Sequence, residues 1–395
     1  MSSDSIVIAS VARTPMGGFE GDFNSVNASV LGAAAIKASV ERAAIGTDDI
    51  DEVIFGCVLQ AGQGQAPARQ AALGAGLGMG TATATINKMC GSGMKAVMYS
   101  HDMLLADSID VAVAGGMESM SRAPYLIDKA RAGLRMGHAE LQDHMFLDGL
   151  EDAYDKGRLM GTFAEDCAQA YQLSRDCQDD YAIASLERAQ AAIAEGRFDT
   201  EISPVTITNR RGVTVVSIDE QPGKVCLNKI RQLYPAFRKC GSVTAANSSS
   251  ISDGAAALVL MRLSQAEKRG ITPLAKIVAH SSYSGQPHLF PTAPIHAMKK
   301  LSQKTGWDFK DVDLFEINEA FAVVAMAAMK ELSLPHEKVN VNGGACALGH
   351  PIGASGARIL VTLLAAMQDR DVQRGMASIC IGGGEANAIA IELLR

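Results

Sequence analysis

The sequence has no surplus of basic residues, no membrane-length apolar run and no recognisable leader. Its 43 acidic residues outnumber the 36 basic ones, and the net charge of −7 argues against nucleic acid or an anionic membrane as the main partner. The longest strongly apolar stretch, residues 320–329, is too short to cross a bilayer, which needs about 20 residues. The first residues lack a basic region, a long apolar region and a cleavage site, so we expect a cytoplasmic protein.

Closely spaced cysteine pairs are also missing. The eight cysteines include no C-x-x-C pair, which argues against a metal or dithiol redox centre. There is no P-loop, no H-x-x-E-H-type metal spacing and no G-x-S-x-G elbow. We therefore expect no metal and no resident cofactor. In a reducing compartment the thiols would stay free and available for chemistry.

The length and the apolar pattern indicate the fold class. A chain of 395 residues exceeds the usual size of a single hydrophobic core, so two or more cores are expected. Apolar runs typical of buried strands alternate with alanine-rich helical periodicity, which predicts an α/β fold with helices on both faces of the sheet. The expected strands are residues 6–9, 53–55, 111–114, 256–261, 314–317 and 378–381. The expected helices include residues 30–44, 93–106, 176–196 and 354–368.

Three matched elements suggest that one half of the chain duplicates the other. Segment 50–56 resembles segment 312–318, and a glycine-bearing turn opens a helix both at Cys90 and at residues 350–356. Each of these helices is followed by a strand that we expect to break at its glycines. The common order and the near-equal spacing favour duplication over chance. The mixed, charged region between the halves is interpreted as an insertion that serves a substrate or a neighbouring subunit.

Cys90 is the first candidate for chemistry, because it lies between an expected strand and an expected helix. The positive end of the helix dipole would lower the pKa of a thiol at this point and favour the nucleophilic thiolate. Gly91 and Gly93 would let the backbone approach a bound acyl group. His350, in the matching turn of the second half, could take the thiol proton if the two turns face each other. A buried, inert cysteine and a structural histidine are the alternatives at this stage.

Two further polar positions follow expected strands. Cys380 and the backbone N–H of Gly382 lie where a strand opens into a glycine-rich turn, although a small residue in a buried strand is the simpler interpretation of Cys380. Asn318 follows another strand and precedes a helix. Its amide could hold a water molecule or polarise a carbonyl oxygen, and an N-cap role for that helix is the default.

Taken together, these motifs resemble those of the thiolases, and most closely those of the acetyl-CoA C-acetyltransferases among them. The matching segments are 87–93, 114–120, 243–249, 318–321, 343–356 and 380–384, in order along essentially the whole chain. The resemblance implies an α/β fold in which two similar, duplicated α/β halves form a five-layered αβαβα core with an inserted loop domain. The implied boundaries are 1–120 plus 244–270 for the N-terminal half, 121–243 for the loop domain with CoA-binding and oligomer contacts, and 271–395 for the C-terminal half.

The resemblance also implies a reaction. Two acetyl-CoA molecules would undergo a reversible Claisen condensation to acetoacetyl-CoA and CoA, by a ping-pong mechanism through an acetyl-Cys90 intermediate. His350 would activate Cys90, and Cys380 would move the α-carbon proton of the second acyl-CoA. Asn318, through a held water, and His350 would form one oxyanion site, while the N–H groups of Cys90 and Gly382 would form the other. CoA would be a co-substrate, and no cofactor would be required.

Contacts with CoA and the acyl group follow from the same resemblance. Ser249 would contact the pantetheine, and the pocket wall would consist of Leu150, Met160, Phe237, Ala245, Ala320 and Phe321. Two positions depart from the common family pattern. Leu159 stands where many members have a histidine, so a polar pantetheine contact is absent or replaced. Phe290, followed by Pro291, is similar to thiolases that accept a 2-methyl branch, so we expect Phe290 to shape the acyl pocket.

Three other functions remain open from the sequence. A broader-range 3-ketoacyl-CoA thiolase of fatty-acid or branched-chain degradation would use the same residues. A non-catalytic CoA- or lipid-binding protein of this fold would not need Cys90, His350, Asn318 and Cys380 together. A redox-sensing thiol protein would need Cys90 to pair with a second cysteine, for which Cys380 is the candidate. The resemblance further implies a homotetramer, built as a dimer of dimers through the inserted region.

Overall fold

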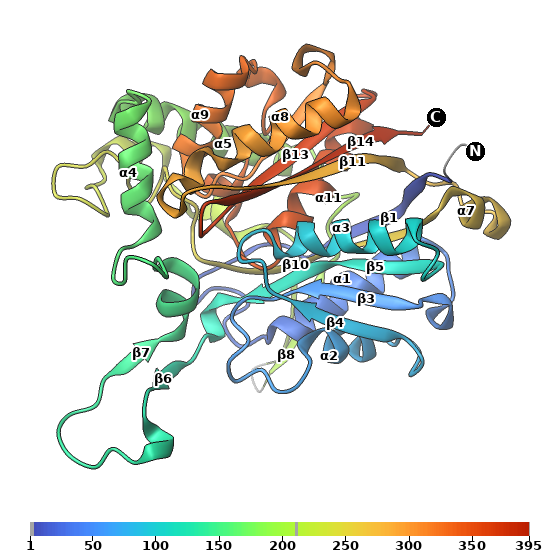
Figure 1. Ribbon diagram of the computed structural model, residues 1–395, viewed down its shortest axis with the longest axis horizontal. Coiled ribbons are helices and arrows are strands. Elements are labelled where there is room, and N and C mark those ends of the chain that lie inside the picture. Colours follow the sequence, from blue (N-terminus) through green and yellow to red (C-terminus); the bar gives the residue numbers. More distant parts are fainter. Residues whose placement is uncertain (1–3, 210–211, 395) are drawn as a thin grey trace.

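The computed structural model describes residues 4–209 and 212–394, which form a ten-stranded sheet, two short hairpins and surrounding helices (Figure 1). The strands of the large sheet are β1 (Ile6–Arg13), β2 (Gly17–Gly18), β3 (Glu52–Gly56), β4 (Ala82–Ile86), β5 (Val111–Ser119), β10 (Ser252–Arg262), β11 (Ala275–Ser284), β12 (Leu314–Ile317), β13 (Arg374–Ile381) and β14 (Glu385–Leu393). The hairpins pair β6 (Tyr125–Ile127) with β7 (Leu141–Asp143), and β8 (Val205–Asn209) with β9 (Gly212–Val216).

The α-helices of the described chain confirm the expected alternation with strands. They are α1 (Ala28–Arg42), α2 (Pro67–Gly74), α3 (Ser92–Leu105), α4 (Met160–Ala170), α5 (Arg175–Ala194), α6 (Glu220–Lys224), α7 (Leu263–Arg269), α8 (Ala293–Thr305), α9 (Ala322–Leu332), α10 (Ala345–Leu348) and α11 (Ser355–Asp369). Every strand and helix that the sequence predicted is present, although several strands extend beyond their apolar runs. None of the helices in the described part of the chain has the length and apolarity needed to cross a membrane.

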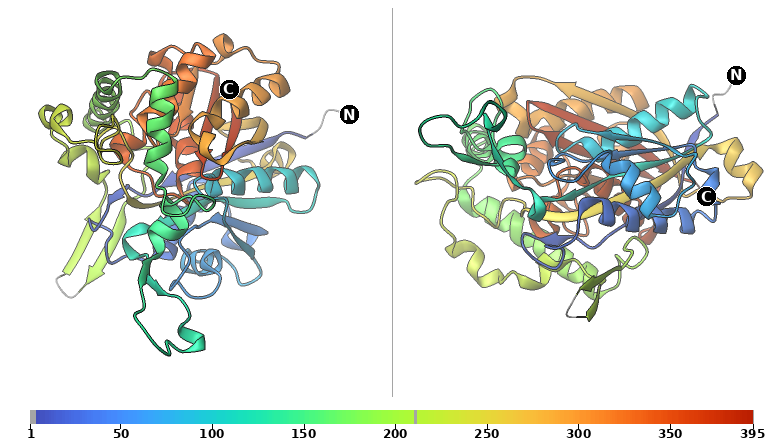
Figure 2. Two further views of the ribbon diagram at one scale, coloured as in Figure 1. Left: turned by 60° about the vertical axis from the view of Figure 1, so that its left-hand side comes forward. Right: turned by 90° about the horizontal axis from the view of Figure 1, so that it is seen from below.

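The large sheet consists of two halves that meet at a short pairing. Its order is β12-β13-β14-β11-β1-β10-β5-β3-β4, and β1 pairs with β11 only at Val7 and Ile8. Helices α3 and α11 pack against each other between the two halves, in one apolar cluster with inward-facing residues of both. Helices α1 and α2 cover the outer face of the N-terminal half, and α8 and α9 cover that of the C-terminal half (Figure 2). The predicted five-layered αβαβα core is therefore confirmed.

A pair of matched aspartates supports the predicted duplication. Asp51 precedes β3 and accepts hydrogen bonds from two backbone N–H groups at the start of β5, at 2.7 and 2.9 Å. Asp313 precedes β12 and accepts two equivalent bonds at the start of β13, at 3.0 and 2.8 Å. The strands are parallel in both cases. The same hydrogen-bonding pattern therefore fixes the equivalent pair of strands in each half.

One part of the predicted repeat is wrong. Strand β5 does not break at its glycines but continues through Gly115 and Gly116 to Ser119. A Cβ atom at Gly116 would lie 2.1 Å from the carbonyl oxygen of Gly353, which precedes α11. Glycine is required there because the turn of the other half presses directly on the strand. The glycines after Cys380 do form a turn, which leads from β13 into β14.

Helices α4 and α5 of the segment 121–243 pack on the C-terminal half, whereas hairpin β8–β9 packs on the N-terminal half. Phe163 of α4 and Tyr181 of α5 join the apolar cluster of α8 and α9, while a smaller cluster links α5 to α10. Hairpin β6–β7 and its connecting loop, which we name the arm (residues 125–143), project away from the body of the molecule (Figures 1 and 2). The segment between the halves thus forms one wall beside the core and one free extension.

Candidate active site

A cavity of about 800 Å³ lies where the Cys90 turn, the His350 turn, the β13–β14 turn and the segment 121–243 meet. Cys90, His350, Cys380 and Gly382 all line it. So do the residues predicted to contact CoA and the acyl group, which are Ser249, Leu150, Met160, Phe237, Ala245, Ala320, Phe321 and Phe290. The structure thus brings residues scattered over nearly the whole sequence to one cavity, and the turns of the two halves face each other there.

Cys90 lies in a tight turn between β4 and α3. The hydroxyl of Ser92 fixes this turn, because it accepts from the backbone N–H of Lys88 at 2.8 Å and donates to the carbonyl of Met89 at 2.6 Å. Met89 has a left-handed backbone conformation, with φ at +47°, which is uncommon for a residue with a long side chain. Cys90 is therefore presented by a strained turn just before the first helical residue.

The predicted lowering of the Cys90 pKa is wrong. Burial raises the pKa of the thiol to about 11, although the backbone N–H groups of Gly382 and of Cys90 itself hydrogen-bond the sulfur and offset part of the shift, and the charge of Glu118 raises it again. The dipole argument fails because exclusion of water from the sulfur outweighs the field of a helix that begins only at Ser92. The resting nucleophile is a neutral thiol, approached by two N–H groups.

His350 is buried, and its hydrogen bonds select one tautomer. Its Nδ1 lies 2.5 Å from the hydroxyl oxygen of Ser355, and that hydroxyl donates to the carbonyl of Pro351 at 2.9 Å. Since the hydroxyl proton is committed to Pro351, the proton between the ring and Ser355 belongs to Nδ1. Nε2 is then unprotonated, and it is buried without a hydrogen-bond partner in the described chain. Burial and the positive charge of Arg358 lower the pKa of His350 to about 3, so the ring is a neutral base.

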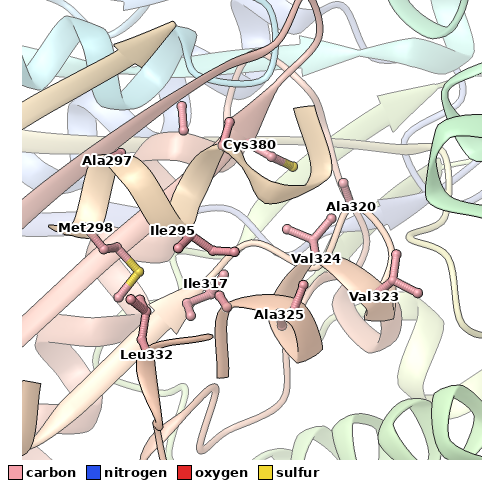
Figure 3. Packing of buried hydrophobic residues seen from close by; sticks show 14 of the residues in the cluster. Ile295, Ala297, Met298, Ile317, Ala320, Val323, Val324, Ala325, Leu332 and Cys380 are labelled. Atoms are coloured by element: carbon pink, nitrogen blue, oxygen red, sulfur yellow. The ribbon is translucent and has the colours of Figure 1, made fainter. Parts of the chain in front are cut away.

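Cys380 is the second thiol of the cavity. It lies near the end of β13, opposite Ala386 of β14, and is almost fully buried. Figure 3 shows it as a member of the apolar cluster that also contains Ile295 of α8 and Val324 of α9. Burial and the neighbouring Cys90 raise the pKa of Cys380 well above its ordinary value. The two thiols are therefore close enough to influence each other's ionisation.

Asn318 does not cap a helix, contrary to the default prediction. Helix α9 begins only at Ala322, and Phe321 occupies the cap position. The backbone N–H of Asn318 donates to the backbone carbonyl of Ser378 in β13 at 3.0 Å. Both polar atoms of its side chain are buried and have no partner among the described residues. Asn318 does not line the cavity, but an unsatisfied buried amide of this kind fits a site for a bound water molecule.

The glycines beside Cys90 pack directly against the C-terminal half. A Cβ atom at Gly91 would lie 2.3 Å from Cδ1 of Ile381, and one at Gly93 would lie 2.8 Å from the backbone nitrogen of Ala357 in α11. The atoms that approach these glycines belong to the C-terminal half of the protein, and the approach to a bound acyl group stays a prediction. Their small size allows the two catalytic turns to approach each other.

Glu118 of β5 is a site residue that the sequence analysis missed. Its fully buried carboxylate accepts backbone N–H bonds from Val58 at 3.0 Å, Leu59 at 3.1 Å and Gly353 at 2.9 Å. Gly353 belongs to the turn that carries His350, so this carboxylate joins the two halves beside the cavity. Burial raises the pKa of Glu118 to about 7, although the three N–H groups counteract the shift. The only sequence signal is its place in segment 114–120, whose residues had no assigned role.

Glu319 is a second missed residue, directly after Asn318. It accepts hydrogen bonds from Tyr181 at 2.9 Å, Ser185 at 2.8 Å and Asn340 at 2.7 Å. Tyr181 and Ser185 are on α5, so Glu319 fastens this helix to the loop that carries Asn318. No periodicity in the sequence points to this contact, because its partners are distant along the chain.

The cavity wall is mainly apolar, with one oriented hydroxyl. Ser249 donates its hydroxyl proton to the carbonyl of Ala320 at 3.0 Å, which leaves its oxygen free to accept from an N–H group of a ligand. Leu159, where the resemblance led us to note the absence of a histidine, lines the cavity with an apolar side chain. Phe290 is 3% exposed and makes edge-to-face contacts with Phe163 and Phe321, at centroid distances of 6.1 and 6.4 Å. Phe290 and Phe321 thus form an aromatic part of the cavity wall, and Phe163 packs against Phe290 from outside the lining.

Known proteins share both the sequence and the fold of the chain. A family model of the thiolase N-terminal domain matches residues 6–264, and one of the thiolase C-terminal domain matches residues 271–393. Acetyl-CoA acetyltransferase 2 of Arabidopsis thaliana is 50% identical over 393 residues, with 98% of this chain and 97% of the relative covered. An Escherichia coli (strain K12) acetyl-CoA acetyltransferase is 50% identical over 391 residues, with 98% and 99% covered. The crystal structure of the Bacillus anthracis acetyl-CoA acetyltransferase matches with a TM-score of 0.96 at 40% identity, and 99% of each chain is covered.

The chain therefore belongs to the thiolase family. It is an acyltransferase enzyme, with two thiols and an imidazole on the wall of the cavity described above.

Proposed function

We propose that the protein is an acetyl-CoA C-acetyltransferase, which condenses two acetyl-CoA molecules reversibly to acetoacetyl-CoA and CoA. The observation that carries this proposal is the position of Cys90, His350 and Cys380 on one cavity, with Nε2 of His350 unprotonated and unpartnered. The printed names of relatives that are 50% identical over nearly the whole length support the same activity.

The first half-reaction transfers an acetyl group to Cys90. The sulfur attacks the thioester carbonyl while the thiol proton passes to Nε2 of His350. The bond between the acetyl carbon and the CoA sulfur then breaks, and the departing CoA thiolate takes a proton from Cys380. Because the resting thiol has a raised pKa and the imidazole a lowered one, the ion pair does not persist in the free enzyme. The nucleophile is therefore activated only when the substrate arrives.

The second half-reaction forms the carbon–carbon bond. The Cys380 thiolate removes a proton from the methyl group of a second acetyl-CoA. Burial makes this thiolate a strong base, which suits a weakly acidic C–H bond. The resulting enolate carbon attacks the carbonyl of acetyl-Cys90, the carbon–sulfur bond breaks, and the sulfur of Cys90 regains its proton from His350.

Two pairs of donors stabilise the negative oxygens of these steps. The N–H groups of Cys90 and Gly382 already converge on the sulfur of Cys90, and they serve the carbonyl oxygen of the attached acetyl group. Protonated His350 and a water held by the unpartnered amide of Asn318 serve the enolate oxygen. Losing one such donor typically costs about 10²–10³-fold in kcat. CoA is a co-substrate, and besides the held water these steps use side-chain and backbone groups of the protein.

The proposed domain division assigns different parts of this reaction to different segments. The N-terminal half supplies Cys90, and the C-terminal half supplies His350 and Cys380. The loop domain, residues 121–243, supplies Met160 and Phe237 to the wall that faces CoA. Ser249, with its free acceptor oxygen, would receive an amide N–H of the pantetheine.

The aromatic part of the cavity wall favours a short acyl group over the longer chains of a broad-range thiolase. Steady-state rates on C4, C6 and C8 ketoacyl-CoA substrates test this, and a preference for C6 or C8 would contradict it. Phe290→Met replaces the ring with a flexible side chain. We expect this variant to lose activity on 2-methylacetoacetyl-CoA several-fold more than on acetoacetyl-CoA, because the ring shapes the space beside the α-carbon. Equal losses on both substrates would assign Phe290 a packing role only.

Mass spectrometry after a pulse of acetyl-CoA tests the reaction itself. One acetyl group should appear on Cys90, be absent in Cys90→Ala and persist in Cys380→Ser, although the latter variant should no longer condense acetyl-CoA. No adduct in the native protein, or an adduct on another residue, would overturn the proposed mechanism.

The proposed homotetramer is supported by the arm. Tyr125, Met136 and Leu141 on it are 64%, 97% and 65% exposed, and exposed apolar side chains in such numbers are typical of an interaction surface. Light scattering on the native protein should give the mass of four chains. Replacement of residues 128–140 by a short glycine-serine linker should give dimers, whereas an unchanged mass would exclude the arm from the interface.

A further inference from the structure

Three potential metal-ligand side chains meet outside the catalytic cavity, between the two halves of the protein. His101 and Asp102 are neighbours on α3, and His280 lies on β11, which runs beside α3 in Figure 1. Oδ1 of Asp102 is 3.1 Å from Nδ1 of His101 and 2.8 Å from Nε2 of His280. The two imidazole rings are perpendicular, with centroids 4.9 Å apart. Among the described residues, this is the one group of three or more histidine, cysteine or acidic side chains with the spacing of a metal site.

We propose that His101, Asp102 and His280 bind a divalent first-row transition metal ion, with Zn²⁺ as the occupant. Two imidazole nitrogens and one carboxylate oxygen are a donor set that such ions accept, with water at the remaining positions. This site is separate from the proposed reaction, whose steps involve none of the three residues.

The present geometry is close to what a zinc ion requires. Zinc–nitrogen and zinc–oxygen bonds of about 2.0–2.2 Å place neighbouring donor atoms roughly 3.3 Å apart. The donor atoms here lie within 4.8 Å of one another, and two of the three separations are 2.8 and 3.1 Å. The ion would replace the two hydrogen bonds that now converge on Oδ1 of Asp102. The remaining separation, between the two ring nitrogens, is within 4.8 Å and would shorten by a small rotation of one ring.

The burial pattern also fits a bound ion with an open coordination position. The side chains of His101 and His280 are only 10% and 15% exposed, so their rings are held in place by packing. The side chain of Asp102 is 57% exposed, which leaves the solvent side open for the ion to enter and for water ligands. Both histidines lie inside regular elements, and rigid elements hold ligands more precisely than loops do.

Nearby cations have partners of their own. The ammonium group of Lys304 donates to the backbone carbonyl of His280 at 2.8 Å. That of Lys95 lies over the ring of Tyr99, 4.5 Å from its centroid. The carboxylate of Asp102 therefore remains available to offset the charge of a divalent ion.

The position of the site indicates what the ion would do. Helix α3 starts at the Cys90 turn, and β11 belongs to the C-terminal half of the sheet. His101 is eleven residues after Cys90, or roughly 16 Å at the rise of an α-helix. An ion at this point would cross-link the two halves and leave the reacting groups untouched. Its expected effect is on the stability of the folded enzyme and not on the chemical step.

Zinc binding to the intact, reduced protein tests the proposal. Zn²⁺ is titrated in competition with a chromophoric chelator, for native protein and for His280→Gln, Asp102→Asn and His138→Gln. His138 is an exposed histidine of the arm and serves as the matched control. Cysteine thiols contribute equally to all four proteins, so the difference between them isolates the site.

We expect native protein and His138→Gln to bind one more equivalent of Zn²⁺ than His280→Gln, and Asp102→Asn to bind that equivalent at least tenfold more weakly. Saturating Zn²⁺ should raise the unfolding temperature of the first two proteins more than that of His280→Gln. All four should have the same acetyl-transfer rate without added metal, which also shows that the variants fold. Equal zinc stoichiometry and affinity in all four proteins would overturn the proposal and leave the cluster as a hydrogen-bonded contact.

Discussion

The two halves of the protein contain the same structural unit, yet they bring different chemistry to the cavity. In each half, a turn leads into a central helix whose first residue is a buried serine. Ser92 bonds to the backbone of the turn that presents Cys90. Ser355 bonds to the ring of His350 and to the carbonyl of Pro351. The first helical residue therefore fixes the turn of the nucleophile Cys90 in one half. In the other half, it selects the tautomer of the base His350.

The strands that follow these helices differ in a similar way. The matched aspartates bind the backbone N–H groups of Val111 in β5 and Arg374 in β13, so these two residues are equivalent. Six residues further along each strand are Met117 and Cys380, which therefore occupy equivalent positions. Met117 packs in the outer apolar cluster of its half, whereas Cys380 also reaches the cavity. The comparison shows that the features shared by the halves are those that fix the backbone. The features that differ are those that react.

Loss of the base should have the largest effect. His350→Gln removes the acceptor of the Cys90 proton, and general-base catalysis contributes about 10²–10⁴-fold, so acetylation of Cys90 should slow by that factor. Native acetylation should be nearly independent of pH between 6 and 9, because the lowered pKa keeps His350 neutral throughout. The variant must rely on the thiolate, whose fraction rises tenfold per pH unit below the raised pKa of Cys90.

Rapid quenching followed by mass spectrometry of acetyl-Cys90 at several pH values measures both effects. Ser355→Ala keeps the ring but frees its tautomer, and it should fall between the native protein and His350→Gln. A variant that retains native rate and a flat pH profile would show that another group takes the proton.

Loss of the Glu118 carboxylate, which joins the two halves, should have the next largest effect. Glu118→Gln leaves one of the two carboxylate oxygens, so at least one of the three N–H donors loses its acceptor. An unsatisfied buried donor costs about 1–3 kcal/mol, and we expect a free energy of unfolding lower by about that amount. The rate should fall as well, because the N–H of Gly353 in the His350 turn is among the donors.

The raised pKa of Glu118 also predicts how the stability difference between the native protein and Glu118→Gln changes with pH. The pKa of Glu118 is about 7 in the folded protein and 4.5 ordinarily, so the folded state retains a proton between these values that the unfolded chain has released. The stabilisation from that proton is fully present below pH 4.5 and is lost as the pH rises through 7. Urea unfolding should therefore show the gap between native protein and Glu118→Gln narrowing from pH 5 to pH 8. A gap that stays constant over this range would mean that the native carboxylate is ionised throughout.

These contacts also mark the limit of prediction from sequence. The strands, the central helices and the residues Cys90, His350 and Cys380 were all predictable, because they depend on local periodicity and on motifs. The bonds of Glu118 join residues far apart in the sequence, and no local pattern encodes them. The pKa of Cys90 was predicted in the wrong direction for a related reason. The helix dipole is visible in the sequence, whereas the burial that outweighs it results from packing of the whole chain.

The approach of the two central helices can be tested from both sides. A Cβ atom at Gly93 would lie 2.8 Å from the backbone nitrogen of Ala357, and one at Gly356 would lie 2.5 Å from that of Met94. Gly93→Ala and Gly356→Ala should each cost about 1–2 kcal/mol, since overpacking exceeds the gain of up to about 1 kcal/mol in helix propensity. Gly223 of α6 has open space around it, so Gly223→Ala is the control and should not destabilise. Thermal unfolding of the three variants measures these losses. Equal unfolding midpoints for Gly93→Ala, Gly356→Ala and Gly223→Ala would contradict the close contact of the two helices.

The smallest expected effect is the one that tests the duplication most directly. Asp51→Ala and Asp313→Ala each remove two hydrogen bonds to the backbone of a parallel strand, and each should lower the free energy of unfolding by about 1 kcal/mol. Asp313 is half-buried and Asp51 exposed, so the loss at Asp313 should be the larger one. Glu41→Ala removes only an exposed ion pair with Lys37 and serves as the charge control. Urea unfolding in which only one aspartate variant differs from Glu41→Ala would show that the two halves share the geometry of this contact but not its contribution to stability.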